Sequence, residues 1–231
     1  MKVVFIHGSG SYKGVWRYQI GRFQDGDALT LPGHPEGQTC QDVEEYADWV
    51  REYIMGKAYE DVVLCGQSLG GAIALMYALN YPGGLKGIII INSAARFTKR
   101  SPLLLWEREE AVRSNPRPWF RRLEQLFQFT PVDFMCEVMG KMIAMGPSVG
   151  LNDVHALSGF DILDRLHEIE LPALIIHGDW DTNISMEMAN ELAKGLPKSK
   201  LVFIPQGTHF VFAEKPDLVN KAIEDFLNCL S

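Results

Sequence analysis

One stretch decides the fold: Asp61-Val62-Val63-Leu64-Cys65-Gly66-Gln67-Ser68-Leu69-Gly70-Gly71. Its first half is short, apolar and rich in β-branched residues, which predicts a buried strand. Residues 72–79 are good helix formers and apolar nearly all the way round, which predicts a buried helix. A strand that feeds a helix through one serine, with glycines two positions away on either side, makes a turn too tight for side chains there. We therefore expect the Ser68 hydroxyl to stand out above the sheet edge.

Short apolar runs alternate with amphipathic segments on both sides of this stretch. Before this stretch and directly after it, strands are expected at 3–6, 28–31, 61–65 and 85–91. Helices are expected at 15–23 and in the segment that ends at residue 54, for which Thr39 is the expected N-cap. Near the C-terminus, strands are expected at 172–176 and 201–204, and helices at 186–195, capped by Ser185, and 216–230. This alternation predicts an α/β fold, a doubly wound, mainly parallel sheet of about six strands with helices on both faces.

The pattern changes between residues 94 and 166, where no strand-like run occurs. Four prolines there each follow a residue that favours a helix start, at Ser101-Pro102, Asn115-Pro116, Thr130-Pro131 and Gly146-Pro147. We expect four short helices, forming an all-helical lid at 94–166 that is inserted into an α/β core made of 1–93 and 167–231.

Composition excludes several classes of protein. A chain of 231 residues with 47% hydrophobic residues suits one domain with an insertion. A net charge of −7 argues against nucleic-acid binding, which needs a basic surface. The four cysteines are scattered, which indicates neither a disulfide framework nor a metal site and is typical of a reducing compartment. The apolar part of the N-terminus is too short for a signal peptide, and no run is long enough to span a membrane, so we expect a cytoplasmic protein.

Acid–base side chains follow the two late strands. A serine hydroxyl needs a base to take its proton, the base needs an orienting acid, and in a parallel sheet these groups should follow strand ends. After 172–176 comes His177-Gly178-Asp179-Trp180-Asp181, and after 201–204 comes Pro205-Gln206-Gly207-Thr208-His209. His209 is the candidate base, and Asp179 and Asp181 are both candidate acids. His7, His34 and His177 lie at strand-end turns, where we expect them to make structural hydrogen bonds.

These motifs together give the sequence a resemblance, over essentially its whole length, to the α/β-hydrolase superfamily, as a serine carboxylesterase-like member with a helical lid. The residues that carry it are His7-Gly8-Ser9-Gly10, Leu31-Pro32-Gly33-His34, the turn at Ser68, His177 to Asp181, Gly207-Thr208-His209-Phe210 and Glu214-Lys215-Pro216. The sequence begins on the strand before the Gly8 loop, so we expect the core to lack the first two strands of larger members.

The resemblance implies a role for each site residue. Ser68 would be the nucleophile, His209 the general base and Asp181 the orienting acid, because the family pattern His-Gly-x-x-Asp selects the second aspartate. The oxyanion hole would come from the backbone N–H groups of Ser9 and Leu69. Neither a cofactor nor a metal is implied.

The apolar residues of the lid allow two interpretations. Amphipathic helices usually bury such faces against a core. Alternatively, some of these side chains line a substrate pocket, for which the candidates are Trp106, Trp119, Phe134, Met135 and Met139, with Phe210 beside the base.

The sequence therefore indicates a serine hydrolase that cleaves a carboxylic ester of a small to medium apolar acid through an acyl-enzyme. The expected partner is a small-molecule ester, with the protein a monomer or homodimer that contacts neither nucleic acid nor membrane. The same residues would equally serve a thioesterase, an amidase or a C–C bond hydrolase, since pocket contacts set the substrate. A hydrolase-fold ligand receptor with slow or no turnover is the alternative outside catalysis.

Overall fold

The computed structural model describes residues 1–97 and 117–230. Its centre is a six-stranded sheet in the order β2-β1-β3-β4-β5-β6, with every neighbouring pair parallel. The strands are β1 (Lys2–Ile6), β2 (Gly26–Leu29), β3 (Val62–Gln67), β4 (Leu85–Ile91), β5 (Ala173–Gly178) and β6 (Ser199–Ile204). The predicted α/β fold with six parallel strands is confirmed.

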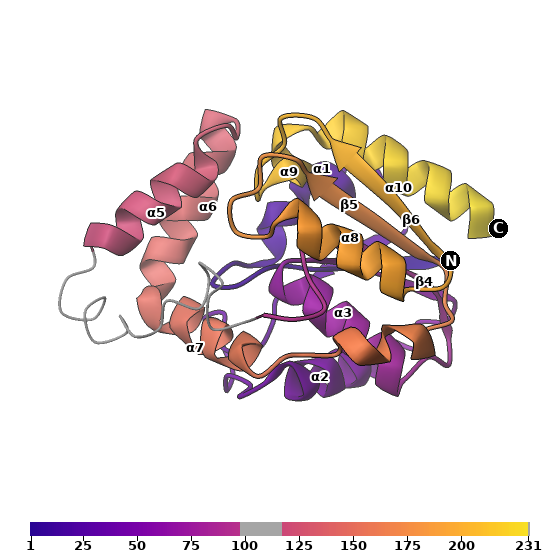
Figure 1. The fold of residues 1–231 in the computed structure, drawn as a ribbon. Coiled ribbons are helices and arrows are strands. Elements are labelled where there is room, and N and C mark those ends of the chain that lie inside the picture. Colours follow the sequence, from indigo (N-terminus) through magenta and orange to yellow (C-terminus); the bar gives the residue numbers. More distant parts are fainter. Residues whose placement is uncertain (98–116, 231) are drawn as a thin grey trace.

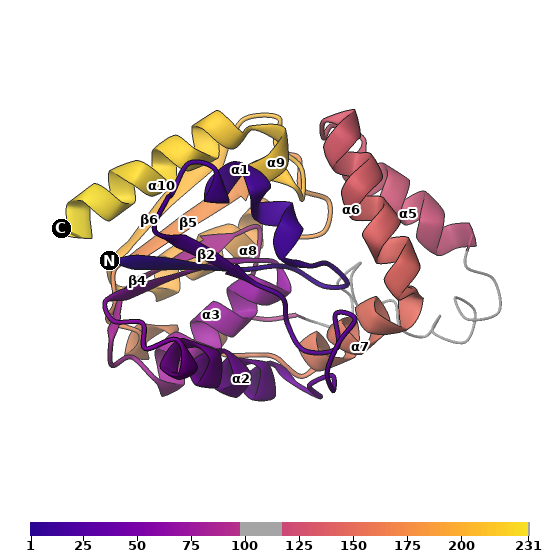
Figure 2. The same ribbon diagram turned by 180° about the vertical axis from the view of Figure 1, so that it is seen from behind.

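Helices cover both faces of the sheet (Figures 1 and 2). Successive strand residues point to opposite sides, so Ile88 and Ile90 belong to one buried cluster and Ile89 and Ile91 to the other. The first face is covered by α2 (Val43–Gly56), α3 (Leu69–Asn80) and α8 (Met186–Gly195). The second is covered by η1 (Lys13–Trp16), α1 (Arg17–Ile20), α9 (Val211–Glu214) and α10 (Pro216–Leu230). Burial on both sides explains why the central strands β3, β4 and β5 are apolar over most of their length.

Between β4 and β5 the chain forms α5 (Arg117–Phe127), α6 (Val132–Met145) and α7 (Pro147–Ser158), here called the inserted helices, followed by η4 (Leu163–Glu168). They lie at the end of the sheet opposite the two chain termini (Figure 1). The segment leaves and rejoins the core at one place, where Phe97 N donates to Phe160 O at 3.1 Å. Helix α7 begins at Pro147, as predicted, whereas α6 begins at Val132, one residue later than predicted, with Pro131 as its N-cap. The helix expected at Pro102 and the start expected at Pro116 lie outside the described residues.

Strand β2 ends earlier than the predicted strand 28–31. Its last paired residue, Leu29, lies opposite Ile6, the last residue of β1. The pairing of β2 with β1 ends there, and Leu31 N donates to the side-chain atom His7 Nε2 at 3.0 Å instead of to a backbone carbonyl of β1. The length of the partner strand therefore sets the boundary of β2.

Two helix predictions near the N-terminus need correction. The segment 15–23 is a 3₁₀ turn followed by a single α-helical turn rather than one helix. Thr39 does not cap α2, because Asp42 takes that position and accepts from Glu45 N at 2.8 Å. The C-terminal predictions hold, since Ser185 caps α8 and the last helix spans Pro216–Leu230. No helix within the two described ranges combines the length and apolar character that crossing a bilayer requires.

Candidate active site

Ser68 occupies a strained turn between β3 and α3. Its backbone has φ 53° and ψ −115°, a conformation that residues other than glycine rarely adopt. A Cβ atom at Gly66 would collide with the backbone of Gly70, and a Cβ atom at Gly70 would collide with the carbonyl of Ile6. The turn therefore requires both glycines, and it holds the serine at the carboxyl end of the sheet.

The backbone around Ser68 is held by β4 and by the start of α3. Ser68 N donates to Ile91 O at 3.1 Å, and the Ser93 hydroxyl donates to Ser68 O at 2.6 Å. Leu69 is the first residue of α3, so its N–H belongs to the helical turn that has no acceptor inside the helix. Since such amides form the positive end of the helix dipole, an anion next to Ser68 would be stabilised there.

His209 is paired with Asp181. Its Nδ1 donates to Asp181 Oδ2 at 2.7 Å, while Asp181 Oδ1 accepts from Asn183 N at 2.7 Å and Ile184 N at 3.1 Å. The Asp181 side chain is fully buried, and it can act only as an acceptor, so the proton of a neutral His209 ring sits on Nδ1. This leaves the lone pair on Nε2, where a general base needs it.

The rival acid, Asp179, has a different partner. Its Oδ1 accepts from Gln206 N at 2.6 Å, and this bond closes the turn after β6. Asp181, and not Asp179, is therefore the carboxylate that contacts His209.

Hydrogen bonds between strand ends hold His209 near Ser68. Gln67 Nε2 donates to His209 O at 3.2 Å, and Asn92 Nδ2 donates to Thr208 O at 2.7 Å. Asn92 Oδ1 also accepts from Gly178 N at 2.9 Å, so this one buried side chain joins the ends of β4 and β5 to the loop after β6. No hydrogen bond joins the Ser68 hydroxyl to His209 in the described part of the chain, a contact that in ligand-free enzymes often closes only on substrate binding.

Asn92 was missed by sequence reasoning. It directly follows the apolar strand β4, and its φ of 44° is one that asparagine tolerates better than most residues. A polar residue just past a buried strand is the same signal that found His209, so inspection of every strand end would have included it.

Residues 7–12, here called the β1 loop, lie against Ser68. A Cβ atom on Gly8 would come within 3.2 Å of Ser68 Cβ, so the backbone just before Ser9 approaches Ser68 directly. His7 Nε2 accepts from Leu31 N at 3.0 Å, and its Nδ1 donates to Gly8 O at 2.8 Å. Burial, aided by the charge of His34, lowers the pKa of His7 to about 3. His7 is therefore a neutral, structural histidine, as predicted.

His177 departs from its prediction. Neither ring nitrogen has a hydrogen-bond partner among the described residues. The ring instead packs edge-on against Phe203, with centroids 5.9 Å apart, and burial lowers its pKa.

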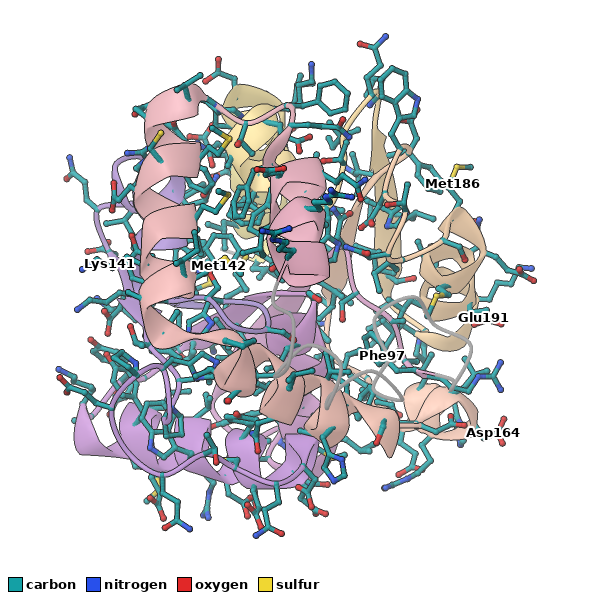
Figure 3. All side chains as sticks on the ribbon, turned by 90° about the vertical axis from the view of Figure 1, so that its left-hand side faces the viewer. Phe97, Lys141, Met142, Asp164, Met186 and Glu191 are labelled. Atoms are coloured by element: carbon teal, nitrogen blue, oxygen red, sulfur yellow. The ribbon has the colours of Figure 1, made fainter. Side chains whose placement is uncertain are left out.

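The apolar candidates form a packed cluster next to His209. The ring centroid of Phe210 lies 6.5 Å from that of Phe134, which is fully buried. Met135 and Met139 are half-buried and pack against the same cluster. Figure 3 looks onto the inserted helices, with Met142 on the inner side of α6 and Lys141 on its outer side. Trp106 and the side chain of Trp119 lie outside the described residues.

A pocket of about 720 Å³ opens beside the β1 loop, and neither Ser68 nor His209 lines it. Its walls come from the β1 loop, the loop after β2, α2 and the last turn of α6, and they include Tyr12, Leu31, His34, Trp49 and Met145. Among the described residues, none of the substrate-binding candidates from the sequence lines this pocket. Trp49 and Tyr12 were missed because their neighbours in the chain give no sign of a cavity.

A parallel sheet that presents a strained serine and, at neighbouring strand ends, a histidine paired with a carboxylate is the architecture of an α/β-hydrolase enzyme. Comparison with known proteins agrees with this class. Residues 3–222 match the model of the Alpha/beta hydrolase family, and the chain belongs to that family.

Individual relatives resemble the chain over most of its length. A pimeloyl-(acyl-carrier protein) methyl ester esterase of Vibrio atlanticus is 25% identical over 238 residues, which cover 93% of this chain and 90% of that protein. A solved thermophilic esterase is similar with a TM-score of 0.84 and 25% identity, covering 100% of this chain and 90% of that one. A bromoperoxidase from Bacillus anthracis, with a TM-score of 0.88 and 20% identity over 98% of this chain and 91% of that one, shares the fold.

Proposed function

We propose that this α/β-hydrolase is a serine esterase that hydrolyses carboxylic esters of small to medium apolar acids through an acyl-enzyme. The observation that carries the proposal is the 2.7 Å bond from His209 Nδ1 to the buried Asp181 carboxylate, next to the strained turn of Ser68. That bond orients a histidine whose other nitrogen is available as a base. The esterase names of two similar proteins support the same reading.

The first half-reaction would form the acyl-enzyme. Ser68 Oγ attacks the ester carbonyl carbon while its proton passes to His209 Nε2, and Asp181 stabilises the imidazolium without taking the proton. The carbonyl oxygen becomes an oxyanion that accepts hydrogen bonds from Ser9 N and Leu69 N. The bond to the alcohol oxygen then breaks, and His209 returns the proton to the leaving alcohol.

The second half-reaction would release the acid. His209 takes a proton from water, the resulting hydroxide attacks the acyl carbon, and the same two amides hold the second oxyanion. Breaking the bond to Ser68 Oγ returns the proton from His209 to the serine. No group beyond the residues of the site is needed.

The substrate would lie between the core and the inserted helices, with residues 94–166 serving as a lid over a core of 1–93 and 167–231. The apolar cluster that contains Phe210, Phe134 and Met135 lies next to His209 and could contact a small or medium acyl or alcohol group. Methionines such as Met135 can adapt their shape, which favours a loosely specific site.

A series of nitrophenyl esters from acetate to octanoate tests the proposal. Wild-type protein should release a burst of nitrophenol equal to the enzyme concentration, with kcat/KM highest for a short or medium chain. Ser68→Ala should show neither burst nor turnover, and full activity in that variant would rule out Ser68 as the nucleophile. The matching thioester and anilide identify a thioesterase or an amidase if they turn over faster, and binding without turnover of any substrate identifies a receptor.

A further inference from the structure

A second buried polar cluster joins the inserted helices to the β1 loop. Asp153 of α7 is fully buried, and its Oδ2 accepts from His34 Nε2 at 2.8 Å and from Gly10 N at 2.7 Å. Its Oδ1 accepts from the Tyr46 hydroxyl at 2.7 Å. The three donors come from the loop after β2, from the β1 loop and from α2, so one carboxylate ties three parts of the core to α7.

The cluster is an ion pair. A buried carboxylate is stable only when it is paired and hydrogen-bonded. His34 Nδ1 donates to Pro32 O at 3.1 Å, and its Nε2 donates to Asp153, so both ring nitrogens carry protons. Burial alone would lower the pKa of His34, but the hydrogen bond and charge of Asp153 raise it above its ordinary value. Asp153 therefore offers Gly10 N a charged acceptor, which makes the bond stronger than one to a neutral oxygen.

The β1 loop lies between α7 and the nucleophile. A Cβ atom on Gly10 would come within 3.3 Å of Gly150 Cα, so the loop backbone touches α7 directly. Gly150 and Asp153 are three residues apart and share one face of that helix. On the opposite side, Gly8 lies against Ser68, where an added Cβ would come within 3.2 Å of Ser68 Cβ. A shift of α7 would therefore be passed on to the atoms beside Ser68.

We propose that Asp153 is a positioning residue for catalysis, which holds Gly10 N so that the neighbouring Ser9 N–H points at the oxyanion. This role rests on the proposed esterase function. An oxyanion donor must lie within a few tenths of an ångström of its working position, and a misplacement of about 1 Å can cost about 10²-fold in rate. Gly10 has φ +62° and no side chain of its own, and Asp153 holds its backbone from outside the loop.

Three variants separate this role from simple structural support. Asp153→Leu removes the acceptor and should lower kcat for a nitrophenyl ester by about 10- to 100-fold with little change in KM. Asp153→Asn keeps an oxygen that can accept from Gly10 N, so it should restore most of kcat. Tyr46→Phe deletes a bond to the same carboxylate without touching the loop, so it should lower Tm while kcat stays within about 2-fold.

The results that would contradict the positioning role differ from the result that would contradict the esterase proposal. If folded Asp153→Leu has wild-type kcat, or if Tyr46→Phe loses kcat as Asp153→Leu does, the positioning role is wrong. Where Asp153→Leu does not fold, Gly10→Ala provides the test, because its Cβ would come within 3.3 Å of Gly150 Cα on a backbone with φ +62° and should displace the loop from α7. This variant should lower kcat about 10-fold, and an unchanged kcat would overturn the role. A wild type without Ser68-dependent turnover overturns the esterase proposal itself, and this role with it.

Discussion

Two histidine–aspartate pairs stand at the carboxyl end of the sheet, one beside Ser68 and one against α7. The nitrogen–oxygen distances are 2.7 Å for His209–Asp181 and 2.8 Å for His34–Asp153. Both nitrogens of His34 are bonded and its side chain is fully buried, whereas His209 Nε2 has no hydrogen-bond partner among the described residues and its side chain is 8% exposed. The hydrogen bonding of the second ring nitrogen therefore distinguishes His209, the candidate base, from His34, whose role is structural.

The largest expected effect is on the first pair. Asp181→Asn keeps the shape of the site but favours the wrong tautomer of His209, so kcat should fall by about 10⁴-fold, as in serine proteases. Steady-state kinetics on a nitrophenyl ester measures it. Asp179→Asn, two residues away, is the matched control and should retain most activity. If the two variants exchanged these results, Asp179 would be the orienting acid.

The second pair should matter most for stability. His34→Ala leaves the buried Asp153 charge without its cation and should lower the free energy of unfolding by about 3–5 kcal/mol. His209→Ala should change it by no more than about 1 kcal/mol, because Asp181 keeps two backbone donors. Urea unfolding at neutral pH measures the unfolding free energy of both variants. Equal decreases in the two variants would show that the two pairs do not differ in their contribution to stability.

His7, whose ring lies 4.8 Å from that of His34, should make stability depend on pH. Its pKa is lowered to about 3 in the folded protein, by burial first and then by the charge of His34, against about 6.5 when unfolded. The unfolded chain therefore binds the extra proton below about pH 6.5, and stability present above that pH is lost as pH falls toward 3, at up to about 1.4 kcal/mol per pH unit.

The measurement is the slope of unfolding free energy against pH between about 5 and 7. His7→Gln should flatten that slope, since glutamine does not titrate. His167→Gln, at an exposed histidine, is the control and should leave the slope unchanged. Parallel slopes for wild type and His7→Gln would show that His7 is not held neutral.

The smallest effect is expected at an exposed contact between the β1 loop and α6. Glu137 accepts from the Tyr12 hydroxyl at 2.7 Å and pairs with Arg17 at 3.1 Å, but its side chain is 48% exposed. Glu137→Gln should therefore cost at most about 1 kcal/mol. Thermal unfolding would register a Tm change of about 3 °C or less. A loss as large as that of His34→Ala would mean that the exposed contact, and not Asp153, holds α6 and α7 to the core.

Most of the fold could be predicted because the decisive signals are local. Strand β4 and helix α10 were predicted with their observed bounds, from an uninterrupted apolar run and from a proline start with one apolar face. The end of β2 could not be predicted, because it depends on where β1 stops supplying partners. The cap of α2 was misassigned because Thr39 and Asp42 are both good caps in sequence, and only the path of the loop decides between them.

The residues of the candidate site also fall into two groups, those that a local sequence signal indicates and those that it does not. Ser68, Asp181 and His209 were found because each follows a strand, and parallel strands bring their ends together. Asp153 gave no such signal, since a single aspartate within a helix is ordinarily solvent-exposed and its partner His34 lies 119 residues away. Contacts that depend on how the inserted helices dock cannot be read from periodicity or motifs.

Labelling with a fluorophosphonate tests most directly whether His209 activates Ser68 as the nucleophile. Wild-type protein should take up one phosphonyl group, mapped by mass spectrometry to the peptide that carries Ser68, and Ser68→Ala should take up none. In His209→Gln, labelling should slow by at least about 10²-fold. An adduct at another residue, or equal rates in wild type and His209→Gln, would contradict the assignment.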